Sequence, residues 1–339
     1  MKQLRIAIDA FGGDNAPQAV VDGCVQALAK YDDWTAILTG DEPRIRAALQ
    51  GHSYDAARVE IVHAPEIITC EEQPTLAIKR KKESSLVRAL QAVKDGQADC
   101  VLSAGSTGAL LAGATLIIRR LPGVKRPALA VLMPTVTGGH ILLLDSGANT
   151  DCKPSYLLQF AVMADAYMRK VERVEKPRVG LLNNGAEAEK GNMLTKAAYP
   201  LLQNAPICFA GNCEARDILS GDFDVVVCDG FDGNVVLKYT EGMASALMGM
   251  LKTELMADTR SKLGAALAKP AFKRFKRKLD YTEYGGAPLL GIAGGVIKAH
   301  GSSNAKAFCS AIEQARAFAA ADVNGSIAEA LAALPEIED

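Results

Sequence analysis

The segment SAGSTGA, residues 103–109, joins two apolar runs, ADCVL (98–102) and LLAGATLII (110–118). The first run has the length and composition of a buried strand, and the second is long enough for a helix. The segment therefore predicts a tight turn between a strand and a helix, which is a local arrangement that directs free backbone N–H groups toward an anion.

The residue types of this turn suit the same purpose. Gly105 and Gly108 allow a ligand to approach the backbone closely. Ser103, Ser106 and Thr107 add hydroxyl donors. The alternative is an ordinary helix N-cap made by Ser106 or Thr107, and this stretch alone leaves both interpretations open.

Composition excludes several classes of function. The chain has 339 residues, 49% of them hydrophobic, and a net charge of −1, so we expect a large core and no nucleic-acid partner. The cysteines have no CxxC or ligand spacing, which favours reduced thiols and no metal site. The N-terminus enters a strand at once and no long uncharged apolar stretch follows, so we expect a cytoplasmic protein without signal peptide or membrane span.

Strand-like and helix-like runs alternate along most of the chain. Helical runs fall at 16–30, 41–50, 84–95, 106–120, 153–171, 191–202 and 233–257. Strand candidates fall at 4–10, 34–40, 59–64, 98–105, 128–134, 140–147, 178–184, 206–211 and 223–230. The short link TVTGG (135–139) predicts a hairpin. We therefore predict a single α/β domain over 1–339, with a mostly parallel but mixed sheet covered by helices on both faces.

Five of the predicted strands end in loops rich in glycine and small polar residues. These loops are DAFGGDNAP (9–17), SAGSTGA (103–109), DSGAN (145–149), NNGAEAEKGN (183–192) and DGFDGN (229–234). Ligands of parallel sheets bind at the carboxyl ends of the strands, so the loops predict a shared crevice that binds an anion. The crevice candidates are Asp9, Gly12, Gly13, Asp14, Ser103, Gly105, Ser106, Thr107, Gly108, Asp145, Asn149, Asn184, Asn192 and Gly233.

Two side chains are candidates for catalysis. Lys190 precedes a predicted helix and could neutralise a phosphate, although it could also be a solvated lysine beside acidic neighbours. Asn234 follows Gly233 and could donate its amide to a developing oxyanion or simply cap the helix. The loops contain no Walker A, GxGxxG or GxSxG sequence, and the histidines follow no ligand spacing. We therefore expect no cofactor, and catalysis by positioning and electrostatic stabilisation.

The loops, in order, resemble those of the phosphate acyltransferases of bacterial phospholipid synthesis, and GGVIKAHGSSNAKAF (294–308) extends the likeness. The resemblance runs from about residue 4 to about residue 318. It differs at Phe11, where the family commonly has Met, and at Asp232, where Thr or Val is usual. We expect the Asp232 carboxylate to point away from the site, because it would disfavour phosphate.

This resemblance implies transfer of an acyl group from acyl-[acyl carrier protein] to inorganic phosphate. It implies a three-layer α/β/α sandwich similar to isocitrate and isopropylmalate dehydrogenases and to phosphotransacetylase. It implies Lys190 and Asn234 as the catalytic pair, and a homodimer in the cytoplasm that associates peripherally with the membrane. Its partners would be the acyl carrier protein, phosphate, and a membrane surface or downstream membrane acyltransferase.

The segment 243–279 is apolar and rich in methionine at first, and then strongly basic. We expect residues 259–279 to form a helical hairpin bent near Pro270 and projecting from the sheet. Its basic cluster would dock an anionic membrane or an acidic carrier protein, unless it is only a solvated face. The cluster consists of Lys273, Arg274, Lys276, Arg277 and Lys278.

Two further functions stay open on the sequence alone. One is another enzyme of similar fold, either an NAD-dependent hydroxyacid dehydrogenase or a transferase that forms acetyl phosphate. The dehydrogenase should carry a metal-binding cluster of aspartates, a spacing that this sequence lacks. The other is a non-catalytic phospholigand-binding or scaffold protein at the membrane, which would need the crevice but not Lys190.

Overall fold

The computed structural model describes residues 3–279 and 285–335, with the backbone only for 276–279. In this part of the chain the strands form an 11-stranded sheet with the order β3-β2-β1-β4-β11-β10-β5-β6-β9-β7-β8. All the predicted strands are present, and two further ones appear near the C-terminus. The strands are β1 (Leu4–Asp9), β2 (Trp34–Gly40), β3 (Val59–His63), β4 (Cys100–Ser103), β5 (Ala128–Pro134), β6 (His140–Leu144), β7 (Arg178–Asn183), β8 (Cys208–Glu214), β9 (Val225–Val227), β10 (Ala287–Leu290) and β11 (Gly295–Lys298).

The direction of the strands divides the sheet into two parallel blocks. Strands β3, β2, β1, β4 and β11 run parallel to one another. Strands β6, β9, β7 and β8 form the second parallel block. Between the blocks, β10 is antiparallel to both β11 and β5, and β5 is antiparallel to β6. The two blocks therefore run in opposite directions. The mixed sheet and the hairpin at 135–139 are both confirmed.

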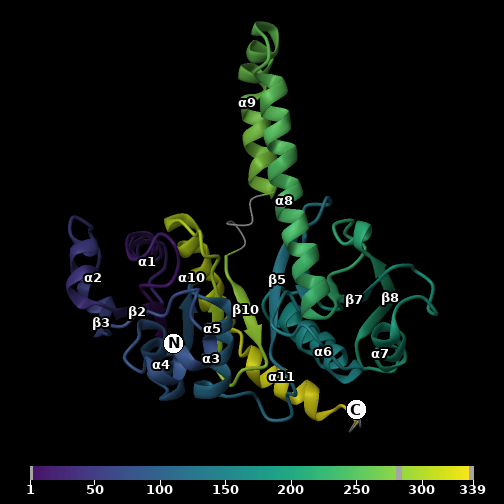
Figure 1. Cartoon of the computed structure of the whole chain (residues 1–339), viewed down its shortest axis with the longest axis horizontal. Helices are drawn as coiled ribbons and strands as arrows, with labels where there is room; N and C mark the ends of the chain where they lie inside the picture. The colour runs from purple at the N-terminus through teal and green to yellow at the C-terminus, as the bar shows by residue number, and fades with distance from the viewer. Residues whose placement is uncertain (1–2, 280–284, 336–339) are drawn as a thin grey trace.

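Helices cover both faces of the sheet, which confirms the three-layer α/β/α arrangement (Figure 1). One face packs against α1, α2, α6, α7, α10 and α11. The other packs against α3, α4 and α5 over the first block and against the base of α8 over the second. The helices are α1 (Gln18–Lys30), α2 (Glu42–Leu49), α3 (Pro74–Arg80), α4 (Ser85–Lys94), α5 (Thr107–Gly113), α6 (Pro154–Lys170), α7 (Met193–Gln203), α8 (Gly230–Leu255), α9 (Thr259–Leu279), α10 (Ala305–Ala320) and α11 (Val323–Ala332).

The helical layer on the second face is interrupted. Its apolar residues form two separate clusters, one under α3, α4 and α5 and one under the base of α8. Strand β5 lies between them, with alternate side chains such as Leu129 and Met133 in different clusters. A hollow between α5 and α8, with β5 as its floor, follows from this packing.

Helices α8 and α9 form a hairpin that projects from the sheet (Figure 1). We expected residues 259–279 to form the whole hairpin, bent at Pro270, and this was wrong. Helix α9 continues through Pro270, and its antiparallel partner is the outer part of α8. A proline removes one intrahelical hydrogen bond, and here that loss is confined to one turn of a long helix packed along α8.

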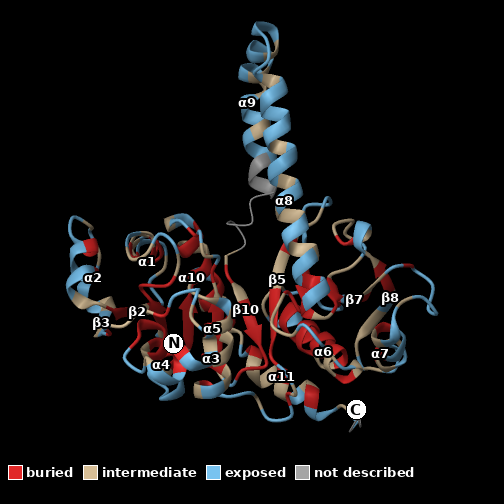
Figure 2. Cartoon of the chain, in the orientation of Figure 1, coloured by how far each residue is buried: buried red, intermediate tan, exposed pale blue. Residues whose placement is uncertain are grey.

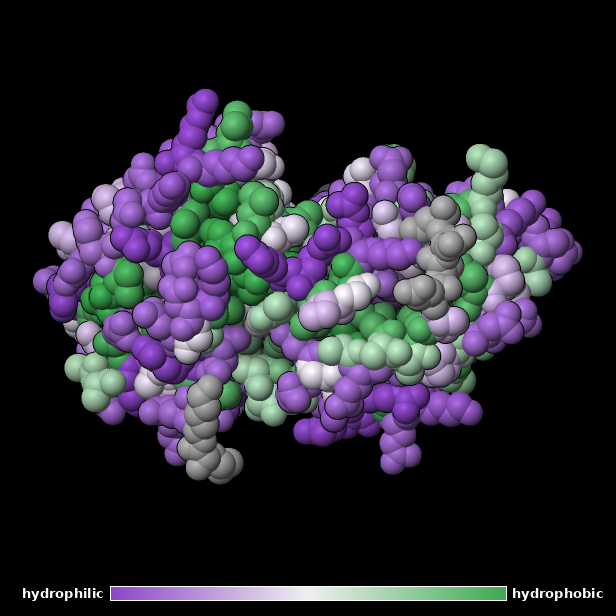
Figure 3. Space-filling model, turned by 90° about the horizontal axis from the view of Figure 1, so that it is seen from below, coloured by the Kyte–Doolittle hydropathy of each residue, from purple (hydrophilic) through white to green (hydrophobic). Residues whose placement is uncertain are grey.

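The hairpin is mostly exposed, whereas the buried residues concentrate in the sheet and its covering helices (Figure 2). Apolar side chains remain in contact with solvent along it, including Leu247, Met250, Leu263 and Leu267. The face turned away from the hairpin shows apolar groups in separate patches between hydrophilic ones (Figure 3). None of the helices in the described ranges combines the length and apolar character needed to cross a bilayer.

Candidate functional site

A cavity of about 670 Å³ occupies the hollow between α5 and α8. Its floor is β5, through Leu129, Val131 and Met133. One wall is α8, whose contributions run from Asn234 to Met248, and the opposite wall includes Thr107 and the end of β11. The volume lies within the range of ordinary small-molecule sites, which is about 300–1,000 Å³.

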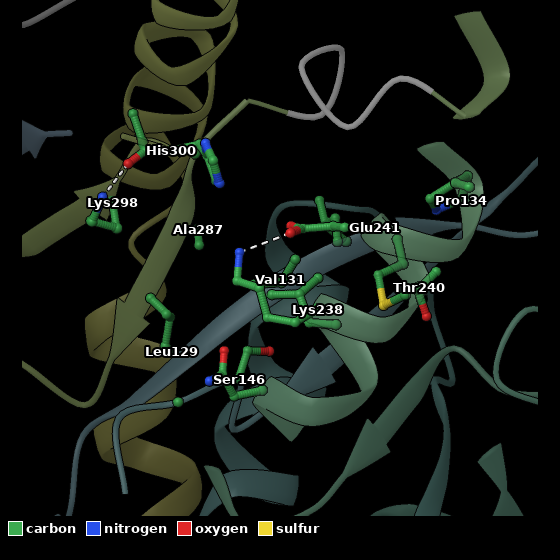
Figure 4. A pocket seen from close by; sticks show the side chains of 18 of the residues that line it. Leu129, Val131, Pro134, Ser146, Lys238, Thr240, Glu241, Ala287, Lys298 and His300 are labelled. Carbon is green, nitrogen blue, oxygen red and sulfur yellow. Dashed lines mark hydrogen bonds and ion pairs between the residues drawn. The ribbon is translucent and has the colours of Figure 1, made fainter. Parts of the chain in front are cut away.

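Polar side chains converge on this mainly apolar space from three sides (Figure 4). Lys298 and His300 lie on one side, and Ser146 lies near the base of the cavity. Lys238 reaches in from α8, where its Nζ is 2.8 Å from Glu241 Oε2. Burial lowers the pKa of His300, and the charge of Lys238 lowers it further. The cavity thus combines a mainly apolar channel along β5 and α8 with several cationic or hydrogen-bonding side chains.

The loops after β1 and β4 are locked together by a buried carboxylate. Ser103 Oγ donates to Asp9 Oδ2 at 2.7 Å and accepts from Gly105 N at 3.0 Å. A Cβ at Gly12 would lie only 2.6 Å from Asp9 Oδ2, so this position requires glycine. Burial raises the pKa of Asp9, while hydrogen bonds from Ser85 and Ser103 oppose that rise. Asp9 and Ser103 therefore hold the two turns in shape.

Most of the other candidates in these two loops support the backbone, and one of them lines the cavity. Asp14 is exposed, and its backbone N donates to Gly301 O at 2.8 Å. Gly13 has φ +97°, which favours glycine, and Gly108 packs closely against Pro74. Ser106 caps α5 by accepting from Ala109 N at 3.3 Å, so for this residue the N-cap interpretation holds. Thr107 lines the cavity.

The loop after β6 is built around Asp145, which is fully buried. Its carboxylate accepts hydrogen bonds from the backbone N of Leu129, Gly147, Ala148 and Asn149, at 2.7–3.2 Å. The Asn149 amide also donates to it, at 2.8 Å. Burial raises the pKa of Asp145, against these hydrogen bonds. Asp145 and Asn149 thus organise the loop that brings Ser146 and Gly147 to the cavity.

Helix α8 begins against this same loop. Asp229 is its N-cap and accepts from Asp232 N at 2.8 Å. A Cβ at Gly233 would overlap the carbonyl oxygen of Asp145, so the helix can approach only with glycine there. Asn234 follows and lies against Gly147, where an added Cβ would be 3.5 Å from the Cβ of Asn234. The suggestion that Asn234 caps the helix was therefore wrong, and its exposed amide lines the cavity. Asp232 is also exposed, and it lies outside the described residues that line the cavity.

Lys190 lies in the loop after β7, and β7 pairs with β9. Its side chain is exposed and passes over Gly185, where a Cβ would be 2.8 Å from Lys190 Cγ. Helix α7 begins at Met193, two residues later than predicted, and Asn192 caps it by accepting from Thr195 N at 2.9 Å. Asn184 is exposed in the same loop. Lys190 lies outside the set of described residues that line the cavity.

The five loops therefore share a sheet but not one edge of it. The loops after β1 and β4 follow strands of one block, whereas those after β6, β7 and β9 follow strands that run the opposite way. Of the predicted site residues, Thr107 and Asn234 line the cavity between the blocks. Sequence reasoning missed Lys238 and Lys298. Lys238 lies one helical turn after Asn234, which was a usable signal.

Comparison with known proteins gives the family. The model of the family described as "Fatty acid synthesis protein" matches residues 4–326. A phosphate acyltransferase of Clostridium perfringens is 51% identical over 327 residues, covering 96% of each chain. A phosphate acyltransferase of Clostridium botulinum is 53% identical over 313 residues, covering 92% of this chain and 93% of the relative.

Solved structures agree on the fold. A phosphotransacetylase from Staphylococcus aureus has a TM-score of 0.58 at 18% identity, covering 98% of this chain and 95% of its own. A 4-hydroxythreonine-4-phosphate dehydrogenase from Klebsiella pneumoniae has a TM-score of 0.54 at 14% identity, covering 94% and 99%. With the two close relatives and the family model, these results identify the chain as an acyltransferase that belongs to the phosphate acyltransferase family of fatty acid synthesis.

Proposed function

We propose that the chain transfers a fatty acyl group from acyl-[acyl carrier protein] to inorganic phosphate and releases acyl phosphate. The observation that carries this proposal is the cavity, because it combines an apolar channel with polar groups at its base and side. An oxygen of phosphate attacks the thioester carbonyl carbon, and the Asn234 amide donates to the oxyanion that forms. Lys190, in the neighbouring loop, neutralises the phosphate. The continuous sheet supports one catalytic domain for the whole chain.

The test is a phosphate-dependent transfer assay with the purified full chain. Acyl-[acyl carrier protein] and phosphate are supplied, acyl phosphate is detected directly by phosphorus NMR, and released thiol is measured in parallel. We expect equal amounts of acyl phosphate and thiol, and neither without phosphate. Thiol release that does not need phosphate would indicate a thioesterase and contradict the proposal. The matching coenzyme A thioester, as an alternative donor, shows whether the carrier protein is required.

We further propose that the acyl chain lies between β5 and α8. Asn234 and Met248 both line the cavity and are about 21 Å apart along α8, at 1.5 Å per residue. An acyl chain of a membrane lipid spans half of the hydrocarbon core, or about 15 Å. A chain with its carbonyl carbon near Asn234 would therefore end about one helical turn before the Met248 backbone. Because helical side chains lean toward the N-terminus of the helix, the Met248 side chain would meet the end of the acyl chain.

We expect Met248→Trp to shift the preference of the enzyme toward shorter acyl chains. A larger side chain at the end of the channel would expel about two methylene groups, each worth about 0.8 kcal/mol, and so lower kcat/KM for the longest substrate about tenfold. The measurement is kcat/KM over a series of chain lengths. Met250→Trp is the matched control, because Met250 is 65% exposed on the same helix. Equal preferences in both variants and the wild type would contradict this placement.

The hairpin of α8 and α9 is our candidate docking surface for the acidic carrier protein or an anionic membrane. Exposed apolar side chains on a projecting hairpin are typical of interaction surfaces, and Lys273 and Arg274 are exposed on α9. The side chains of Lys276, Arg277 and Lys278 lie outside the described residues. We also propose that the protein is a cytoplasmic homodimer that associates peripherally with the membrane, where the acyl phosphate passes to a downstream acyltransferase.

Replacing all five basic residues of the cluster by Gln should weaken docking at low salt, because each cation near an anionic surface contributes about 1 kcal/mol. Binding to anionic vesicles and the KM for the carrier substrate are each measured against salt concentration. A rise in KM alone would assign the cluster to the carrier protein, and loss of vesicle binding alone would assign it to the membrane. If neither quantity changes, the cluster is only a solvated face.

A further inference from the structure

Lys298 is a half-buried cation on the wall of the cavity. It is the last residue of β11, where it pairs with Ser103 of β4 on one side and Ala287 of β10 on the other. Its Nζ donates to Ala104 O at 3.2 Å and to Ala299 O. An ammonium group has three N–H donors. Two of them hold Nζ in place, and the third is available to a ligand in the cavity.

Charged and titratable groups surround this ammonium from several elements. Asp9 is the last residue of β1, and Asp14 belongs to the loop that follows it. Cys70 belongs to the loop after β3, and Lys238 to α8. His300 follows in its own loop, and Lys298 lowers the pKa of that imidazole. Burial is the main cause that lowers the pKa of Lys298, to about 8, and Lys238 adds to it, whereas Cys70, Asp9 and Asp14 oppose it. Both protonation states are therefore accessible close to neutral pH.

We propose that Lys298 is the general acid that protonates the departing thiol during acyl transfer. This rests on the proposed function. A phosphate oxygen forms a bond to the thioester carbonyl carbon, and the C–S bond then breaks. The sulfur leaves with the electron pair of that bond and takes a proton from Lys298 Nζ. The acyl phosphate releases the proton that the attacking hydrogen phosphate carried, and the neutral amine regains one proton through water, so the cycle balances without a further reactant.

The chemistry of the leaving group favours this role over simple charge neutralisation. An alkyl thiol has a pKa of about 8.5, which lies above the second pKa of phosphate, so phosphate returns from the tetrahedral intermediate more readily than the thiolate leaves unless a proton is supplied. General acids work best when their pKa is near that of the medium, and their removal typically costs about 10²–10⁴ in rate. An arginine could supply the charge equally well, but its pKa above about 12 prevents it from giving up a proton.

The experiment compares two small thioesters of the same fatty acid. One is formed with N-acetylcysteamine, an alkyl thiol, and the other with para-nitrothiophenol, whose thiolate leaves without protonation. With the alkyl thioester, we expect Lys298→Gln and Lys298→Arg each to lower kcat about 10²-fold, with little change in the KM for phosphate. With the aryl thioester, both variants should stay within about threefold of the wild type.

Three outcomes would overturn the proposal. An equal loss with both thioesters would make Lys298 a structural residue that holds the Ala104 carbonyl. A raised KM for phosphate with unchanged kcat would make it a phosphate ligand. Full activity in Lys298→Arg would make it a charge only. If the wild type transfers neither acyl group to phosphate, the proposed function fails instead.

The wild-type enzyme provides a test that does not depend on folding of the variants. Because the acid must be protonated, kcat for the alkyl thioester should fall as the pH rises through the pKa of Lys298, near 8. The same limb should be absent with the aryl thioester. A falling limb of equal size with both substrates would contradict the assignment.

Discussion

Lys190→Ala should lower the rate of acyl transfer on the order of 10²–10³-fold while the fold stays intact. The expected loss comes from removing a cation that stabilises phosphate as it attacks. Lys190 is exposed, in a loop that follows β7, and β7 pairs with the strand that leads into Asn234. The measurement is kcat/KM for phosphate, because a phosphate ligand should affect this ratio more than the KM for the acyl donor.

Lys196→Ala is the matched control for Lys190. Lys196 is an exposed lysine in the first turn of α7, only six residues later. Loss of activity in both variants would indicate a general electrostatic effect. A rate for Lys190→Ala within about threefold of the wild type would remove Lys190 from the mechanism. That result would fit its position outside the cavity, and would leave Lys298 and Lys238 as the lysines beside the cavity in the part of the chain that the structure describes.

Asn234→Ala should also reduce kcat on the order of 10²–10³-fold, because it removes a donor to the oxyanion. The capping role of Asp229 makes this result easier to interpret. Loss of an N-cap costs about 1 kcal/mol of stability, whereas an exposed residue elsewhere changes stability by about 0.5 kcal/mol or less. We therefore expect a large loss of activity with an almost unchanged free energy of unfolding.

Asp232→Asn provides the control for Asn234. It changes an exposed residue in the same first turns of α8, and its side chain is absent from the cavity lining in the described ranges. Activity close to that of the wild type is expected. If Asn234→Ala instead lowers stability and rate in parallel, its amide supports the loop around Gly147, and the oxyanion role is wrong.

Local sequence patterns predicted much of the fold. Long apolar runs such as those of β2 and β6 are readable without tertiary information. The central strands β10 and β11 were missed because each has only four residues and follows directly on a glycine. Pairing with two neighbouring strands is what fixes them as strands. Because β10 was not predicted, the opposite directions of the two parallel blocks were not predicted either, since β10 and β5 lie between the blocks.

The candidate site was harder to predict for a related reason. Glycine and small polar residues marked the loops correctly, but some of them organise the backbone around Asp9 and Asp145. Lys238 and Lys298 follow no such pattern. A lysine on a helix or at the end of a strand is most often solvated. Only the tertiary arrangement of α8 and the end of β11 around β5 places these two beside the cavity.

Helix α8 has 26 residues, so it is a rod of about 39 Å that carries Asn234 near one end and forms the exposed hairpin with α9 at the other. The rod is anchored at its base, where Gly230 and Gly233 lie against the loop of Asp145 without room for a side chain. Because the base of α8 is held this tightly, a movement of the far end of the helix would displace Asn234 only a little. If the hairpin docks a partner as proposed, sequence changes in its outer part would alter that docking without moving Asn234.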